Sequence, residues 1–251
     1  ALQRRGEPVV VFDCAEPAAA PTGIRFVRGD IRDPAALVRT GLKEGDVVYH
    51  LAARQFHAQV PWRNRDQWFS EVNVDGTRNV LAAMQEAGAR NLVFFSTDMV
   101  YGLPQQSPLP TSHPRQPLGP YGRSKLAAEN LLAARASDGF RITVFRPRMI
   151  MGAGRLGILA KLFRLIEAGL PVPLIGNGAN RYQMVSVHDC VRAALQAVDR
   201  GLPTGPFNLG SMGPPTVREL LGQVIAKVGS HSRLVGTPAA VMKVALSALD
   251  G

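Results

Sequence analysis

A tyrosine and a lysine separated by three residues are the clearest candidates for chemistry in this chain. Tyr121 and Lys125 lie in the segment Pro120-Tyr121-Gly122-Arg123-Ser124-Lys125, and a proline of this kind suits the first turn of a helix. Positions i and i+4 share one helical face. An ammonium beside a phenol favours the phenolate, which lowers the tyrosine pKa from about 10 and allows general acid–base catalysis at neutral pH. Taken alone, the spacing equally fits a solvent-facing tyrosine near a lysine.

A hydroxyl that could bind the reacting group follows a buried apolar run. The run Leu92 to Phe95 predicts a strand that ends at Ser96-Thr97, and Asp98-Met99-Val100-Tyr101-Gly102 comes next. Thr97 could hydrogen-bond a substrate hydroxyl while Tyr121 removes its proton. Ser96 and Thr97 could also do no more than end the strand, and these two residues alone do not decide between the readings.

The elements that must position these side chains alternate along the chain. Short apolar runs predict strands over residues 9–12, 24–27, 47–51, 92–95, 142–145 and 171–175, and amphipathic or capped segments predict helices over 34–40, 72–87, 120–136, 159–170, 188–198 and 216–228. Alternation of this kind is typical of an α/β protein with a parallel sheet. We expect a Rossmann-like, doubly wound sheet in residues 1–150 and a smaller mixed lobe in 151–251, interleaved with the first domain. Ligands bind such sheets at the carboxyl ends of the strands.

Composition excludes several classes of protein. The chain has 251 residues, is 46% hydrophobic and carries a net charge of +10. The basic residues are scattered singly, so we expect a phosphate-bearing small ligand and no nucleic acid. No stretch is apolar enough to span a membrane. Two cysteines indicate a reduced, cytoplasmic location, and five scattered histidines show no spacing for a metal.

The glycine-rich turn that usually follows the first strand of such a sheet is missing. That turn, Gly-x-x-Gly-x-x-Gly, holds a pyrophosphate at a helix N-terminus. The chain instead opens with Leu2-Gln3-Arg4-Arg5-Gly6, which has the pattern of the tail of that first helix, and it closes with Leu246 to Gly251, which has the pattern of an interrupted helix. We therefore expect the given sequence to begin after the first strand and to end early.

The motifs together resemble those of the extended short-chain dehydrogenase/reductase family, in its NAD-dependent nucleotide-sugar epimerase/dehydratase branch. The family pattern places Ser or Thr before x-x-Val-Tyr-Gly, followed about two dozen residues later by Pro-Tyr-x-x-Ser-Lys, and both stand here in order. The resemblance covers nearly the whole chain. It continues through Gly29-Asp30-Ile31-Arg32-Asp33, His50-Leu51-Ala52-Ala53, Asn73-Val74-Asp75-Gly76-Thr77, Arg146-Pro147, Gly176-Asn177-Gly178 and Phe207-Asn208-Leu209-Gly210.

The resemblance implies NAD as cofactor and a role for each matching residue. Tyr121 would be the acid/base, Lys125 would lower its pKa and hold the nicotinamide ribose, and Thr97 would orient the substrate hydroxyl. The expected cofactor contacts are, besides Tyr121 and Lys125, Asp13 at the adenosine ribose, Asp30 and Ile31 beside adenine, Leu51, Ala52 and Ala53 along the cleft, and Pro147 near the nicotinamide. A carboxylate at Asp13 repels a 2′-phosphate, which favours NAD over NADP. Each of these residues could also be a strand-end cap or plain packing.

The reaction depends on what surrounds this shared core. Dehydratases of the family carry Thr-Asp-Glu at the strand end, whereas this chain has Thr97-Asp98-Met99. Methionine cannot act as the base, so a 4,6-dehydratase is disfavoured. The resemblance implies that Asp98 and Thr97 lie at the substrate, that Arg181 contacts a substrate diphosphate through its planar fork of donors, and that the segment containing His57 forms part of the sugar pocket.

Three hypotheses follow for the function. The first is an NAD-dependent nucleotide-sugar epimerase, acting at C4 through a transient keto intermediate. The second is an NAD(P)-dependent dehydrogenase or reductase of a steroid-like or other small alcohol. The third is a non-catalytic NAD-binding protein. The resemblance also implies a homodimer formed through the helices 72–87 and 120–136.

Overall fold

Four parallel strands form the main sheet. They are β3 (Val47–His50), β4 (Asn91–Phe95), β5 (Arg141–Pro147) and β9 (Gly205–Leu209), hydrogen-bonded in the order β3-β4-β5-β9. A second parallel pair joins β1 (Val9–Asp13) to β2 (Ile24–Arg28), with Asp13 opposite Arg28 at the carboxyl end. The computed structural model describes residues 1–17, 22–55, 60–153 and 159–238. The strands predicted in this part of the chain are present within two residues of their expected ends.

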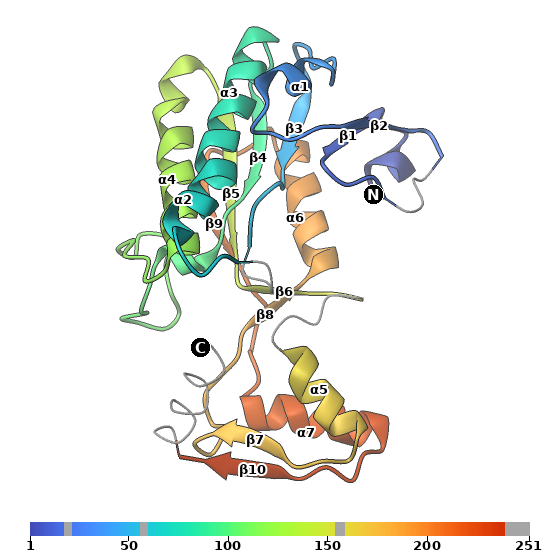
Figure 1. Cartoon of the computed structure of the whole chain (residues 1–251), viewed down its shortest axis with the longest axis vertical. Helices are drawn as coiled ribbons and strands as arrows, with labels where there is room; N and C mark the ends of the chain where they lie inside the picture. Colours follow the sequence, from blue (N-terminus) through green and yellow to red (C-terminus); the bar gives the residue numbers. More distant parts are fainter. Residues whose placement is uncertain (18–21, 56–59, 154–158, 239–251) are drawn as a thin grey trace. The chain divides into compact units, whose positions relative to one another are not determined.

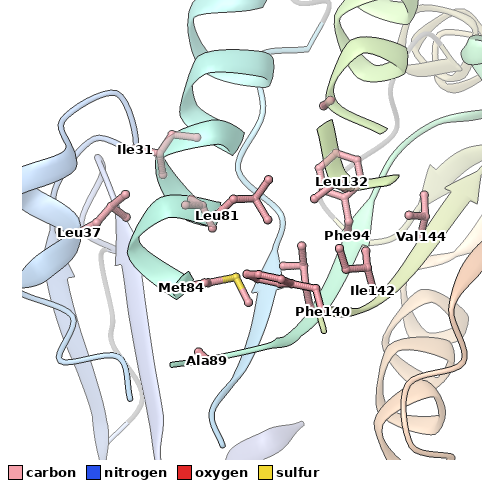
Figure 2. Packing of buried hydrophobic residues seen from close by; sticks show 13 residues of the cluster. Ile31, Leu37, Leu81, Met84, Ala89, Phe94, Leu132, Phe140, Ile142 and Val144 are labelled. Carbon is pink, nitrogen blue, oxygen red and sulfur yellow. The ribbon is translucent and has the colours of Figure 1, made fainter. Parts of the chain in front are cut away.

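Helices cover both faces of the main sheet, as alternating strand residues require. The helices α1 (Pro34–Val38), α3 (Thr77–Glu86) and α4 (Pro120–Ala134) pack with Leu92, Phe94, Ile142 and Val144 in one core cluster (Figure 2). Helix α6 (Val187–Asp199) lies on the opposite face, where Val93 and Phe145 are buried (Figure 1). The doubly wound α/β arrangement predicted from the sequence is therefore confirmed.

The helix predicted over residues 72–87 begins earlier and is not regular. It starts as α2 (Arg65–Ser70), passes through a π-helical segment, η2 (Glu71–Gly76), and continues as α3. Gly76 lies against the buried Ile31 side chain, so that a β-carbon there would overlap it. Periodicity missed the π-segment because one extra residue per turn shifts the apolar stripe, and such segments are frequent at functional sites.

The described residues divide into two compact units. The first consists of Ala1–Pro147 with Val191–Leu209, and the second of Arg148–Cys190 with Gly210–Gly251. The second unit contains α5 (Leu159–Glu167), α7 (Val217–Val228) and the parallel pair β7 (Val172–Ile175) and β10 (Leu234–Thr237), which share a core. It also holds the pair β6 (Met149–Met151) and β8 (Met184–Ser186). The strands β6, β8, β9 and β10 were not predicted.

Short 3₁₀ turns lie next to several of these elements. A 3₁₀ turn, η1 (Leu2–Arg5), stands where the sequence suggested a helix tail, and Arg5 pairs with Asp199 of α6 at 2.8 Å. Two further 3₁₀ turns follow β4 and α4, namely η3 (Asp98–Val100) and η4 (Ala136–Asp138). In the described ranges, no helix is long and apolar enough to cross a membrane.

Candidate active site

The helix α4 presents the predicted tyrosine and lysine on its buried face. Gly119 caps the helix and Pro120 occupies its first turn. Tyr121 is 8% exposed and Lys125 is 2% exposed. The Lys125 Nζ lies 4.0 Å from the centroid of the Phe94 ring in β4, and the Tyr121 ring packs against Phe69 of α2 at 5.7 Å between centroids. The solvent-facing arrangement considered from the sequence is therefore wrong.

Burial changes the chemistry of the Lys125 ammonium. Removal from water lowers the pKa of Lys125 from 10.5 to about 7, and the negative charge of Glu129, one helical turn further on, opposes this fall. Among the residues that the structure describes, none accepts a hydrogen bond from Nζ, and the contact with Phe94 is a cation–π interaction. A buried ammonium with unused donors suits a ligand that brings hydroxyl oxygens.

The turn after β4 places a hydroxyl near the same helix. Thr97 is 7% exposed and caps η3, where its Oγ1 accepts a hydrogen bond from the Met99 backbone N at 3.2 Å. A β-carbon at Gly122 of α4 would lie 2.7 Å from the Met99 carbonyl oxygen, so this turn packs directly on the helix. Beside Thr97, the buried Ser96 Oγ has no hydrogen-bond partner among the described residues.

Asn73 joins three segments of the site and was not predicted as a site residue. It lies in the π-segment η2, and its side-chain amide exchanges hydrogen bonds with the Arg54 backbone, at 2.8 Å to the N and 3.1 Å to the O. Its Nδ2 also donates to Ser124 Oγ at 2.9 Å, and Ser124 Oγ donates to the Tyr121 carbonyl at 2.8 Å. Asn73 thereby links the loop after β3 to the turn of α4 that carries Tyr121. The motifs containing Asn73 and Ser124 were the only sequence signal for this link.

His50, at the end of β3, is a buried neutral group. Its Nε2 lies 2.9 Å from Thr77 Oγ1, which donates to the Asn73 carbonyl, so the ring N–H donates to Thr77. Burial, with a smaller effect of the Lys125 charge, lowers the pKa of His50 to about 3. The histidine therefore helps to hold η2 in place without adding a charge beside Lys125.

The expected adenosine contacts lie at the carboxyl ends of β1 and β2. Asp13 is exposed and, in the described ranges, forms no ion pair; its Oδ1 accepts the Ala15 N–H at 3.0 Å. Asp30 binds the Arg32 guanidinium, 2.7 Å between Oδ2 and Nη2, and this partner lowers the pKa of Asp30. The Ile31 side chain is 7% exposed and belongs to the core beneath α3. The roles assigned to these three residues stay predictions.

The remaining cofactor candidates differ in exposure. Leu51 is 61% exposed and Ala52 is exposed, whereas Ala53 is half-buried, so the segment after β3 offers an open apolar surface. Pro147 is buried at the end of β5, opposite Leu209 of β9. These residues stand at strand ends, where the fold places ligands, and their contacts with a cofactor stay predictions.

The substrate candidates fall in different parts of the chain. Asp98 is half-buried and opens η3 directly after Thr97. Arg181 belongs to the second unit, is exposed, and donates through Nη1 to the Pro214 carbonyl at 2.6 Å. The prediction for His57 lies outside the described residues. No group of three or more potential metal ligands occurs in the described part of the chain.

A doubly wound parallel sheet with helices on both faces defines a Rossmann-like fold. Comparison with known proteins is more specific. The model of the NAD dependent epimerase/dehydratase family matches residues 1–210, and the chain belongs to this family, whose cofactor is NAD.

Two curated relatives and one solved structure illustrate the relationship. The chain is 34% identical over 239 residues to the uncharacterized protein y4nG of Sinorhizobium fredii, covering 94% of this chain and 58% of the relative. It is 40% identical over 193 residues to the UDP-glucose 4-epimerase of Streptomyces lividans, covering 72% and 57%. The dTDP-glucose 4,6-dehydratase of Streptomyces venezuelae with NAD bound has a TM-score of 0.75 at 28% identity, covering 91% of this chain and 74% of that one. The chain thus spans less than two thirds of the length of both curated relatives.

Proposed function

We propose that this protein is an NAD-dependent nucleotide-sugar epimerase that oxidises a sugar carbinol transiently, most simply at C4. The observation that carries the proposal is the buried Lys125 ammonium, one helical turn from the buried Tyr121 and without a hydrogen-bond acceptor in the described part of the chain. A charge is costly to bury without a partner. A ribose that brings hydroxyl oxygens to Nζ would supply the missing acceptors, so the residues present fit NAD.

The chain's own residues divide the work in this proposal. Thr97 Oγ1 holds the reacting hydroxyl of the sugar, and Tyr121 Oη takes its proton as general base and returns it as general acid. Lys125 favours the phenolate electrostatically. Asn73 and Ser124 hold the first turn of α4, which keeps the phenol at a fixed distance from Thr97. Bound NAD would supply the acceptor and then the donor of the hydride.

Asp13 supports the choice of NAD over NADP. Its carboxylate ends β1 without a cation partner among the described residues. It can accept hydrogen bonds from two ribose hydroxyls, and its charge disfavours a 2′-phosphate. Asp30 would flank the adenine, and the segment Leu51 to Ala53 would line the cofactor cleft.

The turn after β4 favours epimerisation over dehydration. A dehydratase needs a base beside the sugar to remove the proton on the neighbouring carbon. Met99 occupies the position of the glutamate in the dehydratase pattern, and its thioether cannot carry a proton at neutral pH. Asp98, whose Oδ1 lies 3.4 Å from Thr97 Oγ1, is proposed to lie at the substrate beside Thr97.

The diphosphate of a nucleotide sugar has a candidate partner in Arg181. Its guanidinium donates to the Pro214 carbonyl, and among the described residues no other acceptor is recorded, so the remaining N–H groups could reach phosphate oxygens. The excess of positive charge over the whole chain is consistent with an anionic substrate.

A second candidate is a dehydrogenase or reductase of an apolar alcohol. Met99 is 41% exposed and Leu51 is 61% exposed, and both follow strands at the edge where the substrate must lie. An apolar alcohol would bury these side chains favourably. Such an enzyme would release reduced cofactor in each cycle, whereas an epimerase recycles it within the turnover.

One assay separates the candidates. The protein is incubated with NAD⁺ and UDP-, GDP- or dTDP-sugars, and the sugar product and the absorbance of NADH are followed. An epimeric sugar without accumulation of NADH is the expected result. Stoichiometric NADH with a steroid or other apolar alcohol would favour the second candidate. If the protein binds NAD but converts neither the nucleotide sugars nor the alcohols, the third hypothesis, a non-catalytic NAD-binding protein, is favoured.

We also propose a cytoplasmic homodimer. The two cysteines are free, Cys14 exposed and Cys190 buried, which suits a reducing compartment. Helices α3 and α4 would form the contact between subunits, as the family resemblance implies. Equilibrium sedimentation of the protein tests the dimer.

A further inference from the structure

Three buried residues and the exposed Asn208, none of them used by the proposed reaction, form a polar network in the first unit. Arg146 of β5 and Glu129 of α4 make a two-pronged ion pair, with N···O distances of 2.6 and 3.0 Å and side chains 3% and 4% exposed. Arg146 Nη1 also donates to Tyr101 Oη at 2.7 Å. The Tyr101 hydroxyl donates to Asn208 Oδ1 of β9, again at 2.7 Å.

The network reaches every segment that carries a candidate catalytic group. Tyr101 ends the turn that begins at Thr97, with only η3 between them. Glu129 stands one helical turn after Lys125 and two turns after Tyr121, on the same buried face of α4. Arg146 directly precedes Pro147. Any rotation of α4 relative to this turn would have to break the Arg146–Glu129 pair or its bond to Tyr101.

The same network holds the loop that leads into α4. Asn208 Nδ2 donates to the Leu109 carbonyl at 2.8 Å, and Arg146 Nη1 contacts the Thr111 carbonyl at 3.3 Å. The His113 ring meets the Tyr101 ring edge-on at 5.7 Å between centroids. The loop is therefore attached at three successive points before it reaches Gly119, the cap of α4.

We propose that Tyr101, Glu129, Arg146 and Asn208 are positioning residues that fix the Thr97 hydroxyl relative to Tyr121 and Lys125. The proposal rests on the proposed function for its kinetic consequence. A fully buried ion pair with all its hydrogen bonds made is rigid, and displacement of a reacting group by about 1 Å can cost on the order of 100-fold in rate. The network thus assigns a task to three motif residues, Tyr101, Arg146 and Asn208, for which the reaction itself has no use.

The test removes one oxygen from the network and compares the loss with a matched control. Tyr101→Phe keeps the ring but removes the bridge between Arg146 and Asn208. Thr143→Val removes one buried hydroxyl hydrogen bond, 2.8 Å to the Pro203 carbonyl, from the amino-terminal half of the same strand β5. Tyr101→Phe loses two hydrogen bonds of a buried hydroxyl and Thr143→Val loses one. A purely structural role therefore predicts a larger loss of stability in Tyr101→Phe but no selective fall in kcat and no change in access to Lys125.

Two readouts are measured under conditions in which both variants are fully folded. We expect Tyr101→Phe to lower kcat at least about 10-fold, with the KM for the sugar changed less than about 3-fold, and Thr143→Val to leave both unchanged. Trace acetylation with acetic anhydride, quantified by mass spectrometry with Lys43 and Lys161 as internal references, measures access to Lys125 without cofactor. Its rate should rise at least about 3-fold in Tyr101→Phe only.

The outcomes are distinct. The proposal is overturned if Tyr101→Phe matches Thr143→Val in either readout. If the wild-type protein converts no sugar or alcohol, the proposed function fails instead, and labelling of Lys125 alone then decides whether the network positions α4. Asn208→Ala, which removes the acceptor of the Tyr101 hydroxyl but changes no charge near Lys125, should repeat the effect on labelling, and an unchanged labelling rate in that variant would also contradict the proposal.

Discussion

Replacing Lys125 by methionine should make the stability of the first unit depend differently on pH. In the folded protein burial lowers the pKa of Lys125 to about 7, whereas the unfolded chain restores its ordinary value of 10.5. Between these two values the unfolded state binds one proton more than the folded state. Stability of the wild type therefore rises with pH in this window, by about 1.4 kcal/mol per pH unit relative to a chain without the group.

The expected magnitude can be worked out for an accessible range. The full difference between the two pKa values corresponds to about 5 kcal/mol. At pH 7 the folded lysine is already half deprotonated. Between pH 7 and pH 9, the free energy of unfolding of the wild type should therefore rise by roughly 2 kcal/mol relative to that of Lys125→Met. Methionine has a similar length and packs readily in apolar surroundings, so the variant should fold and be the more stable protein at pH 7.

Urea unfolding at pH 7, 8 and 9, followed by tryptophan fluorescence, measures this difference. Both tryptophans, Trp62 and Trp68, lie in the first unit, so the signal reports on the unit that contains Lys125. Lys161→Met, at an exposed lysine of α5, is the control and should show no such dependence. A difference between wild type and Lys125→Met that stays constant within about 0.5 kcal/mol across these pH values would refute the reasoning.

Three further predictions concern the site. Tyr121→Phe should lower kcat about 1,000-fold and change the Kd for NAD less than about 3-fold, because only proton transfer is lost; loss of less than 10-fold would contradict its role as acid/base. Asn73→Ala should lower the free energy of unfolding by about 2 kcal/mol in urea titrations, since the Arg54 backbone loses both of its partners there. Asp13→Ala should reduce the preference for NAD over NADP at least about 10-fold in fluorescence titrations, and an unchanged ratio would exclude Asp13 as the ribose partner.

Local patterns predicted the elements that are regular along the chain. Strands β1 to β5 and β7 follow apolar runs, and α4 follows a proline at its first turn, so their positions depend on short-range rules. The π-segment in the helix that begins at Arg65 was not predicted, because it depends on contacts with residues distant in sequence. Gly76 packs against Ile31, and Asn73 bonds to residues of other segments. Strand β8 was missed because it is only three residues long, and β9 because most of its residues are exposed and show no alternating apolar pattern.

The hydrogen-bond partners of the candidate site residues could not be predicted from the spacing of residues in the sequence. Asn73 and Ser124 are 51 residues apart, and Arg146 and Tyr101 are 45 apart. A hydrogen bond across such a distance depends on which strands become neighbours, and no local propensity encodes that. The motifs predicted which residues to expect at the site, but the role of Asn73 as a link between three segments emerged only from the folded structure.

The sequence by itself determined that Tyr121 and Lys125 share one face of a helix, because a spacing of four residues has that consequence in any α-helix. Tertiary structure decided which way the face points. Packing of α4 against β4 buries Lys125 over Phe94, removes its ammonium from water and brings its pKa to about 7. The cost of burying a charge depends on every atom around it, and those atoms come from segments that only folding brings together.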